Sequence, residues 1–222
     1  MSINKLTAWL LTIGPIGMFV IWGIIDPIVL GEVADGLAPV EEATANVQRY
    51  ADNEVTGWIL SLSGGFSMLG MMVGLGLLAK SMQAGGATLG SLCGYIFPAL
   101  VAMMVFGFGS EISGQEILVG GNGVAGDPEL GGMLSLVGNS AFGAFPIFWG
   151  LGLTLLGLGI TREDGPLPSI MGWIMTVMGV VMFSMSFGLG DEIGFFAWIG
   201  ASLVVSATGV LSLLAIRKAA AA

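Results

Sequence analysis

Long apolar runs alternate with short polar segments along this chain of 222 residues. Each run is long enough to cross a bilayer core, which takes about 20 residues of α-helix. The pattern predicts six transmembrane helices, at about 6–30, 56–79, 87–109, 128–160, 169–189 and 193–216. The polar segments between them are too short to bury a core of their own. We therefore expect residues 1–222 to form a single all-α integral membrane domain.

Two polar, acidic segments, 31–55 and 110–127, are expected at the outer membrane face. In the first, Pro39 suits the opening position of a helix. Apolar residues then recur at helical spacing, opposite polar ones: Val40, Ala43, Val47 and either Tyr50 or Ala51. This spacing predicts a short amphipathic helix on the membrane face. Such a helix would serve either as a lid on its own bundle or as a surface for a partner.

The fourth predicted span, 128–160, is longer than a bilayer requires. It opens with Asp127-Pro128-Glu129, an acidic N-cap followed by a proline and a first-turn carboxylate, which favours a helix start. We expect the span to be tilted, or kinked near Pro146.

Similar stretches close the odd-numbered spans. Phe187-Gly-Leu-Gly-Asp191-Glu192 resembles Phe106-Gly-Phe-Gly-Ser110-Glu111, and Trp22-Gly-Ile-Ile-Asp26 is a looser copy. The pattern predicts three helical hairpins that each turn beside a carboxylate at one membrane face. Ser61-Leu62-x-Gly64 in the second span likewise matches Ser135-Leu136-x-Gly138 in the fourth. Two alternative explanations account for these matches. One is an internal repeat of the parallel kind, and the other is a chance likeness between glycine-rich helices.

The basic residues predict the orientation of the spans. With the N-terminus inside, Arg49 is the basic residue at the outer face. The other five basic residues lie on the cytoplasmic side: Lys5, Lys80, Arg162, Arg217 and Lys218. Cytoplasmic loops are enriched in lysine and arginine, so both termini are expected in the cytoplasm. All carboxylates other than Glu163 and Asp164 then lie at a negative outer face that attracts cations. We expect a prokaryotic plasma membrane.

The carboxylates at the hairpin corners are the candidate cation-binding residues: Asp26, Glu111, Asp191 and Glu192. A negative charge is unfavourable at a helix C-terminus, and a broken local rule can mark a functional site. If the hairpins pack around one axis, these acids approach one another and bind a cation or proton. Alternatively, Asp191 and Glu192 only favour the start of the last helix, and no site exists.

Small residues mark candidate helix contacts. The chain has 38 glycines, and several fall four residues apart: Gly70 and Gly74, then Gly86, Gly90 and Gly94. Such spacing lets helix backbones approach closely, either within one bundle or between copies. Asn139 and Ser140 are polar residues within the fourth span and need hydrogen-bond partners in hydrocarbon. They either bond across helices or line a polar path.

Composition excludes several classes of site. The chain has no histidine and one cysteine, Cys93, so haem, copper and histidine-ligated zinc sites are not expected. We predict no metal and no cofactor, and the sequence identifies no lipid or pigment ligand. Four of the 14 methionines share one helical face: Met175, Met178, Met182 and Met185. Packing in an apolar core explains this face better than copper(I) binding does. A net charge of −9 argues against nucleic acid as a partner.

Two functions follow from these patterns. No nucleophile motif or deep acid/base pair is present, so the first is a non-catalytic structural or accessory membrane protein. It would associate with itself or serve as a subunit of a larger membrane complex, with lipid and protein as its partners. The alternative is a small cation or proton channel or transporter with an acidic outer vestibule.

Overall fold

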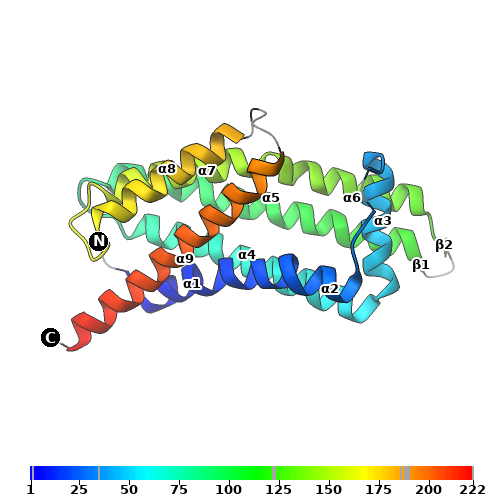
Figure 1. Cartoon of the computed structure of the whole chain (residues 1–222), viewed down its shortest axis with the longest axis horizontal. Coiled ribbons are helices and arrows are strands. Elements are labelled where there is room, and N and C mark those ends of the chain that lie inside the picture. Colours follow the sequence, from blue (N-terminus) through cyan, green and yellow to red (C-terminus); the bar gives the residue numbers. More distant parts are fainter. Residues whose placement is uncertain (2, 35, 122–123, 186, 188–190, 222) are drawn as a thin grey trace. The chain divides into compact units, whose positions relative to one another are not determined.

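A computed structural model describes the chain apart from residues 2, 35, 122–123, 186, 188–190 and 222. At residues 54, 121, 124, 185 and 191–195 it describes the backbone only. Helices dominate (Figure 1). In order, the elements are α1 (Lys5–Val20), a π-helical turn η1 (Ile21–Ile25), α2 (Asp26–Leu30), α3 (Pro39–Asp52), α4 (Glu54–Lys80), α5 (Ala87–Val119), β1 (Gly120–Gly121), β2 (Val124–Ala125), α6 (Pro128–Gly143), α7 (Phe145–Ile160), α8 (Ser169–Met185) and α9 (Asp191–Ala221).

Among the described residues, five stretches are long and apolar enough to cross a membrane: Lys5–Leu30, Val55–Lys80, Ala87–Val119, Pro128–Ile160 and Phe196–Ala221. This finding is consistent with an integral, multi-pass membrane protein. The remaining predicted span, 169–189, is represented by α8, which has 17 residues. At a rise of 1.5 Å per residue, α8 is shorter than a bilayer core of about 30 Å. The six-span, three-hairpin arrangement therefore stays a prediction.

Several local predictions are confirmed. Helix α3 begins at Pro39, and Ala43 and Val47 on its apolar face are buried. The predicted kink near Pro146 is a break, because α6 ends at Gly143 and α7 begins at Phe145. At the start of α6, the Asp127 carboxylate accepts a hydrogen bond of 3.0 Å from the Leu130 N–H, as an N-cap should.

The largest difference from a predicted boundary is at the end of α5. Helix α5 does not stop at Gly109 but continues to Val119, so residues 110–119 are helical. The reason is contact with α6. A methyl group at Gly114 would lie 2.8 Å from the carbonyl oxygen of Gly131, which shows how closely the two backbones approach there. After α5 the chain turns through the antiparallel strands β1 and β2, where Gly120 pairs with Ala125.

The chain folds into two compact units. Unit 1 comprises residues 1–17, 66–101 and 144–222, and unit 2 comprises residues 18–65 and 102–143. The boundaries between the units fall within α1, α4 and α5 and between α6 and α7, so α1, α4 and α5 each contribute to both units.

In unit 1, α7 and α8 lie side by side (Figure 1). Glycines bring the two backbones together: a methyl group at Gly157 would lie 2.5 Å from the Gly172 carbonyl oxygen, and one at Gly150 would lie 2.7 Å from that of Gly179. Phe145, Trp149 and Trp198 form an aromatic cluster with ring centroids 4.8–5.7 Å apart. The glycine contacts thus join α7 to α8, and the aromatic cluster joins α7 to α9.

A buried carboxylate connects two turns of unit 1. Glu163 accepts backbone hydrogen bonds from Gln83 (3.1 Å), Ala84 (2.7 Å) and Gly86 (3.1 Å), and its other oxygen lies 3.4 Å from the amine of Met1. Burial alone would raise the pKa of Glu163, but these donors lower it below its usual value. Glu163 thus stays charged and joins the α4–α5 turn to the α7–α8 turn.

Methionines of α8 and Cys93 lie in the packing of unit 1, whereas the side chain of Met185 lies outside the described part of the structure. Met171, Met175 and Met182 are buried, and Met178 contacts Gly200 of α9. Cys93 is also buried, with its sulfur 3.5 Å from the Gly152 carbonyl oxygen. The positions of these methionines fit the expectation that they fill apolar gaps.

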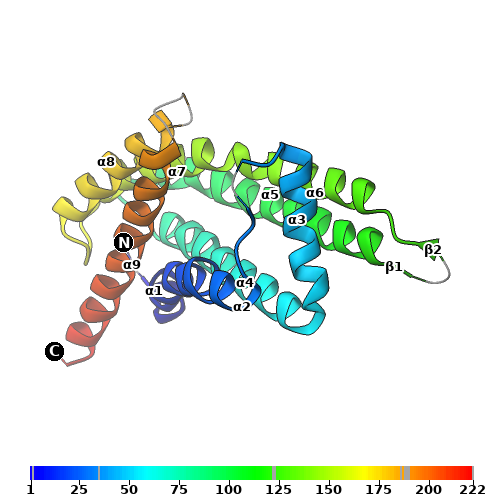
Figure 2. The ribbon, with the colours of Figure 1, turned by 45° about the vertical axis from the view of Figure 1, so that its right-hand side comes forward.

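In unit 2, α3 runs crosswise to α6 (Figures 1 and 2), and the two helices pack against each other. A methyl group at Gly132 of α6 would overlap the hydroxyl of Thr44, so the crossing requires a glycine there. Trp22, Phe108 and Phe142 form an aromatic row with centroid distances of 5.7 and 5.5 Å. Helix α3, which is the most polar helix, is therefore a packed element of unit 2.

Candidate functional site

Asp26 is a buried carboxylate at the end of the first apolar stretch. It opens α2 directly after the π-helical turn, and only 4% of its surface is exposed. An ionisable side chain in such a position is costly unless it is paired. Its partners come from α3: the Tyr50 hydroxyl donates a hydrogen bond to Oδ2, and Arg49 Nη1 lies 3.3 Å from Oδ1.

Arg49 is fixed from several sides. It donates to the Gly31 carbonyl oxygen through Nη1 and to Asn46 Oδ1 at 2.9 Å through Nη2. Gly31 ends α2 with φ = 80°, a conformation that favours glycine, and leaves its carbonyl for Arg49. The guanidinium also lies 5.1 Å from the centroid of the Tyr50 ring. These contacts give Arg49 one geometry in which to face Asp26.

Tyr50 joins α3 to both Asp26 and α4. A methyl group at Gly57 of α4 would lie 2.7 Å from the Tyr50 carbonyl oxygen, so the turn after α3 is tight. Burial, followed by the hydrogen bond to Asp26 and the charge of that carboxylate, raises the pKa of Tyr50. Because the folded pKa lies above the unfolded value of about 10, the contribution of Tyr50 to stability is complete below that pH and is lost at strongly alkaline pH.

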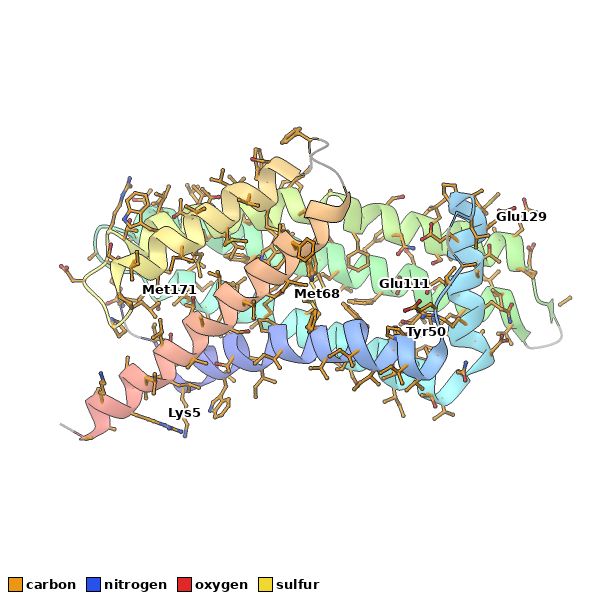
Figure 3. All side chains as sticks on the ribbon, in the orientation of Figure 1. Lys5, Tyr50, Met68, Glu111, Glu129 and Met171 are labelled. Atoms are coloured by element: carbon orange, nitrogen blue, oxygen red, sulfur yellow. The ribbon has the colours of Figure 1, made fainter. Side chains whose placement is uncertain are left out.

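Glu111 of α5 belongs to the same cluster. It is half-buried and lies within electrostatic range of Asp26 and Tyr50. Figure 3 shows Tyr50 and Glu111 in the same part of unit 2. Of the four predicted acids, Asp26 and Glu111 thus lie near enough in unit 2 to interact electrostatically. The side chains of Asp191 and Glu192 lie outside the described part of the structure.

An open pocket of about 490 Å³ lies beside this cluster in unit 2. Its lining residues come from the first apolar stretch, the segment after α2, α3 and α6: Trp22, Asp26, Pro27, Glu32, Val33, Pro39, Glu42, Ala43, Asn46, Arg49, Leu136 and Asn139. Asn139, predicted as an intramembrane polar residue, therefore faces this pocket. Its neighbour Ser140 is exposed and donates a hydrogen bond of 2.8 Å to the Leu136 carbonyl oxygen.

The predicted packing glycines have different surroundings in unit 1. Methyl groups at Gly86 and Gly90 would lie 2.5 Å and 2.4 Å from the carbonyl oxygens of Gly159 and Ala79. At Gly70 and Gly74 the nearest atoms belong to Leu10 and Leu11 of α1, at 3.4 and 3.1 Å. Gly94 has open space around it, with nothing within 4 Å. Helix spacing alone did not distinguish these positions.

Arg49 and Tyr50 are the site residues that sequence reasoning missed. One signal was available, because Arg49 is the basic residue that the predicted orientation leaves alone at the outer face. A cation near several buried or half-buried acids is expected to pair with one of them. Its partner, however, depends on how α3 crosses the unit, which is a tertiary property.

The cluster has the chemistry of a charged pair beside an acidic pocket. Within the described residues, no three histidine, cysteine, aspartate or glutamate side chains are grouped so as to hold a metal ion. Comparison of the chain with protein-family models, curated proteins and solved structures gives no match.

Proposed function

We propose that this chain is a non-catalytic multi-pass membrane protein with a structural or accessory role, associating with copies of itself or with another membrane protein. The pairing of Asp26 supports this function. Its carboxylate is neutralised by Arg49 and hydrogen-bonded by Tyr50. The acid thus holds α3 in place, whereas a carboxylate that receives a transported ion would have to be free for it.

The protein has exposed apolar side chains that lipid or another protein would cover. Large hydrophobic residues are exposed on both units, among them Leu6, Ile28, Val55, Phe66, Tyr95 and Leu203. Apolar surface of this kind is covered in membranes by lipid or by neighbouring helices. A protein that presents it on many helices suits a place within a larger membrane assembly.

The proposed arrangement in the membrane is six spans in three hairpins, with an internal repeat, both termini in the cytoplasm and an acidic outer face. The distribution of basic residues supports this orientation, since five of six lie on one side. The proposed location is a prokaryotic plasma membrane.

Association can be measured with two differently tagged copies of the full chain, expressed together and purified through one tag in mild detergent. The proposal predicts that the second tag co-purifies, or that native mass spectrometry finds another membrane protein bound. Mixing the two copies only after solubilisation controls for exchange in detergent. A lone monomer with neither the second tag nor a partner would refute the proposed association.

A small cation or proton translocator is the second candidate, and the approach of Glu111 to Asp26 favours it. Two nearby carboxylates can share a proton or a cation. In proteoliposomes this function predicts cation or proton flux that falls when Glu111→Gln is introduced. Flux indistinguishable from that of empty liposomes, or unchanged in Glu111→Gln and Glu192→Gln, would rule the translocator out.

A further inference from the structure

Basic side chains gather at one end of unit 1. Hydrogen bonds to Glu163 join the α4–α5 turn to the α7–α8 turn there, and a methyl group at Gly85 would lie 2.6 Å from the Arg162 carbonyl oxygen. The first turn of α1 and the last turns of α9 lie at this same end (Figures 1 and 2). The basic end of unit 1, as we call it, carries Lys5, Lys80, Arg162, Arg217 and Lys218.

The charge of the basic end is not balanced by the acids beside it. All five basic residues are exposed, and no ion pair within the described residues includes any of their side chains. The α7–α8 turn contains two acids, Glu163 and Asp164. Glu163 is buried and accepts hydrogen bonds from backbone N–H groups, so only Asp164 of this turn is an exposed carboxylate. A negatively charged partner is therefore favoured.

Exposed apolar side chains follow two of these cations along their helices. On α1, Lys5 shares a helix face with Trp9 and Ile13, which are 41% and 56% exposed. On α9, Lys218 shares a face with Leu214, which is 47% exposed. A free anion would contact the cations alone. A phospholipid has a charged headgroup next to its acyl chains, and so it matches both the cation and the apolar surface beside it.

We infer that the basic end of unit 1 binds phospholipids with a negatively charged headgroup, whose phosphates lie at Lys5 and Lys218 and whose acyl chains lie along α1 and α9. A lysine or arginine near an anionic lipid surface increases affinity about fivefold. Clusters of about four to eight such residues beside membrane helices are typical of lipid recognition. The inference rests on the proposed membrane location but not on the proposed association with another protein.

Native mass spectrometry of the full chain in mild detergent measures this selectivity. Phosphatidylglycerol and phosphatidylcholine with the same acyl chains are added in equal amounts, and phosphatidylglycerol is expected to bind at least about tenfold more tightly. Inorganic phosphate at the same concentration should displace no lipid, because it has no acyl chain. The measured mass also shows whether a second copy or another protein is bound, so failure of the proposed association would leave the lipid result readable.

Variants locate the binding surface. Lys5→Gln/Lys218→Gln should weaken phosphatidylglycerol binding roughly 20-fold and leave phosphatidylcholine binding unchanged. Both positions are exposed, so Tm without lipid should stay the same, and Lys5→Arg/Lys218→Arg should keep the affinity. The control Glu32→Gln/Glu42→Gln changes two exposed charges of unit 2 and should leave the affinity unchanged.

Four results would each overturn the inference. They are equal affinity for the two lipids, displacement of lipid by inorganic phosphate, unchanged phosphatidylglycerol binding in Lys5→Gln/Lys218→Gln, and a rise in Glu32→Gln/Glu42→Gln as large as the expected loss. The last result would show that net charge, and not the basic end, determines lipid binding.

Discussion

Replacing Arg49 with glutamine is expected to lower the free energy of unfolding by about 3 kcal/mol. The substitution removes the cation 3.3 Å from Asp26 and leaves a carboxylate that is 4% exposed without a charged partner. Removing one member of a buried ion pair costs more than the pair contributes, because the remaining charge stays desolvated. Thermal unfolding in detergent would show a decrease in Tm on the order of 10 °C for a chain of this size.

Two controls make this result specific. Arg217→Gln removes the same charge at an exposed position of α9 and should change Tm little. The double variant Asp26→Asn/Arg49→Gln removes both charges and should recover part of the lost stability. If Arg49→Gln changed Tm no more than Arg217→Gln does, the Asp26–Arg49 pair would have no part in stability.

Gly157→Ala is expected to destabilise the protein by about 1–3 kcal/mol, although alanine is the better helix former. The added methyl group would lie 2.5 Å from the Gly172 carbonyl oxygen and 2.5 Å from the Thr176 amide nitrogen. Both are backbone atoms of α8, so neither can move aside without separating α8 from α7. Thermal unfolding of the variant in detergent measures the loss.

Gly94→Ala is the matched substitution, and it is expected to raise the free energy of unfolding, whereas Gly157→Ala lowers it. Gly94 lies within α5 with nothing within 4 Å of the position that a methyl group would take. Alanine there should stabilise the helix by about 0.5–1 kcal/mol, since glycine has the greater backbone freedom to lose. Equal changes at Gly94 and Gly157 would show that close approach of α7 and α8 does not set their stability.

Short-range features of the fold could be predicted from the sequence. The start of α3 at Pro39 and its buried face at Ala43 and Val47 follow from helical spacing within fourteen residues. The break before α7 follows from Pro146, which disfavours helical geometry in its neighbourhood. Such features depend on residues close in the chain, where propensity and periodicity are informative.

Features that depend on tertiary contact could not be predicted. The glycines around Phe106 resemble those of a hairpin corner, yet α5 continues to Val119 because Gly114 packs against Gly131 of α6. Gly94 and Gly157 are both glycines within apolar helices, and the sequence does not distinguish them. They differ in the atoms that surround them in the folded protein. Asp26 and Arg49 belong to separate helices, so their pairing depends on how α3 crosses unit 2. The sequence identified the acid but not the cation that neutralises it.

Hydrogen exchange of the α3 amides tests most directly whether α3 is held to unit 2 by Asp26. A helix of 14 residues is marginal on its own in water, so protection of Pro39–Asp52 must come from docking. The account predicts strong protection of α3 in the natural protein and its selective loss in Arg49→Gln, with exchange in α7 and α8 unchanged. Rapid exchange of α3 in the natural protein, or equal protection in Arg49→Gln, would contradict it.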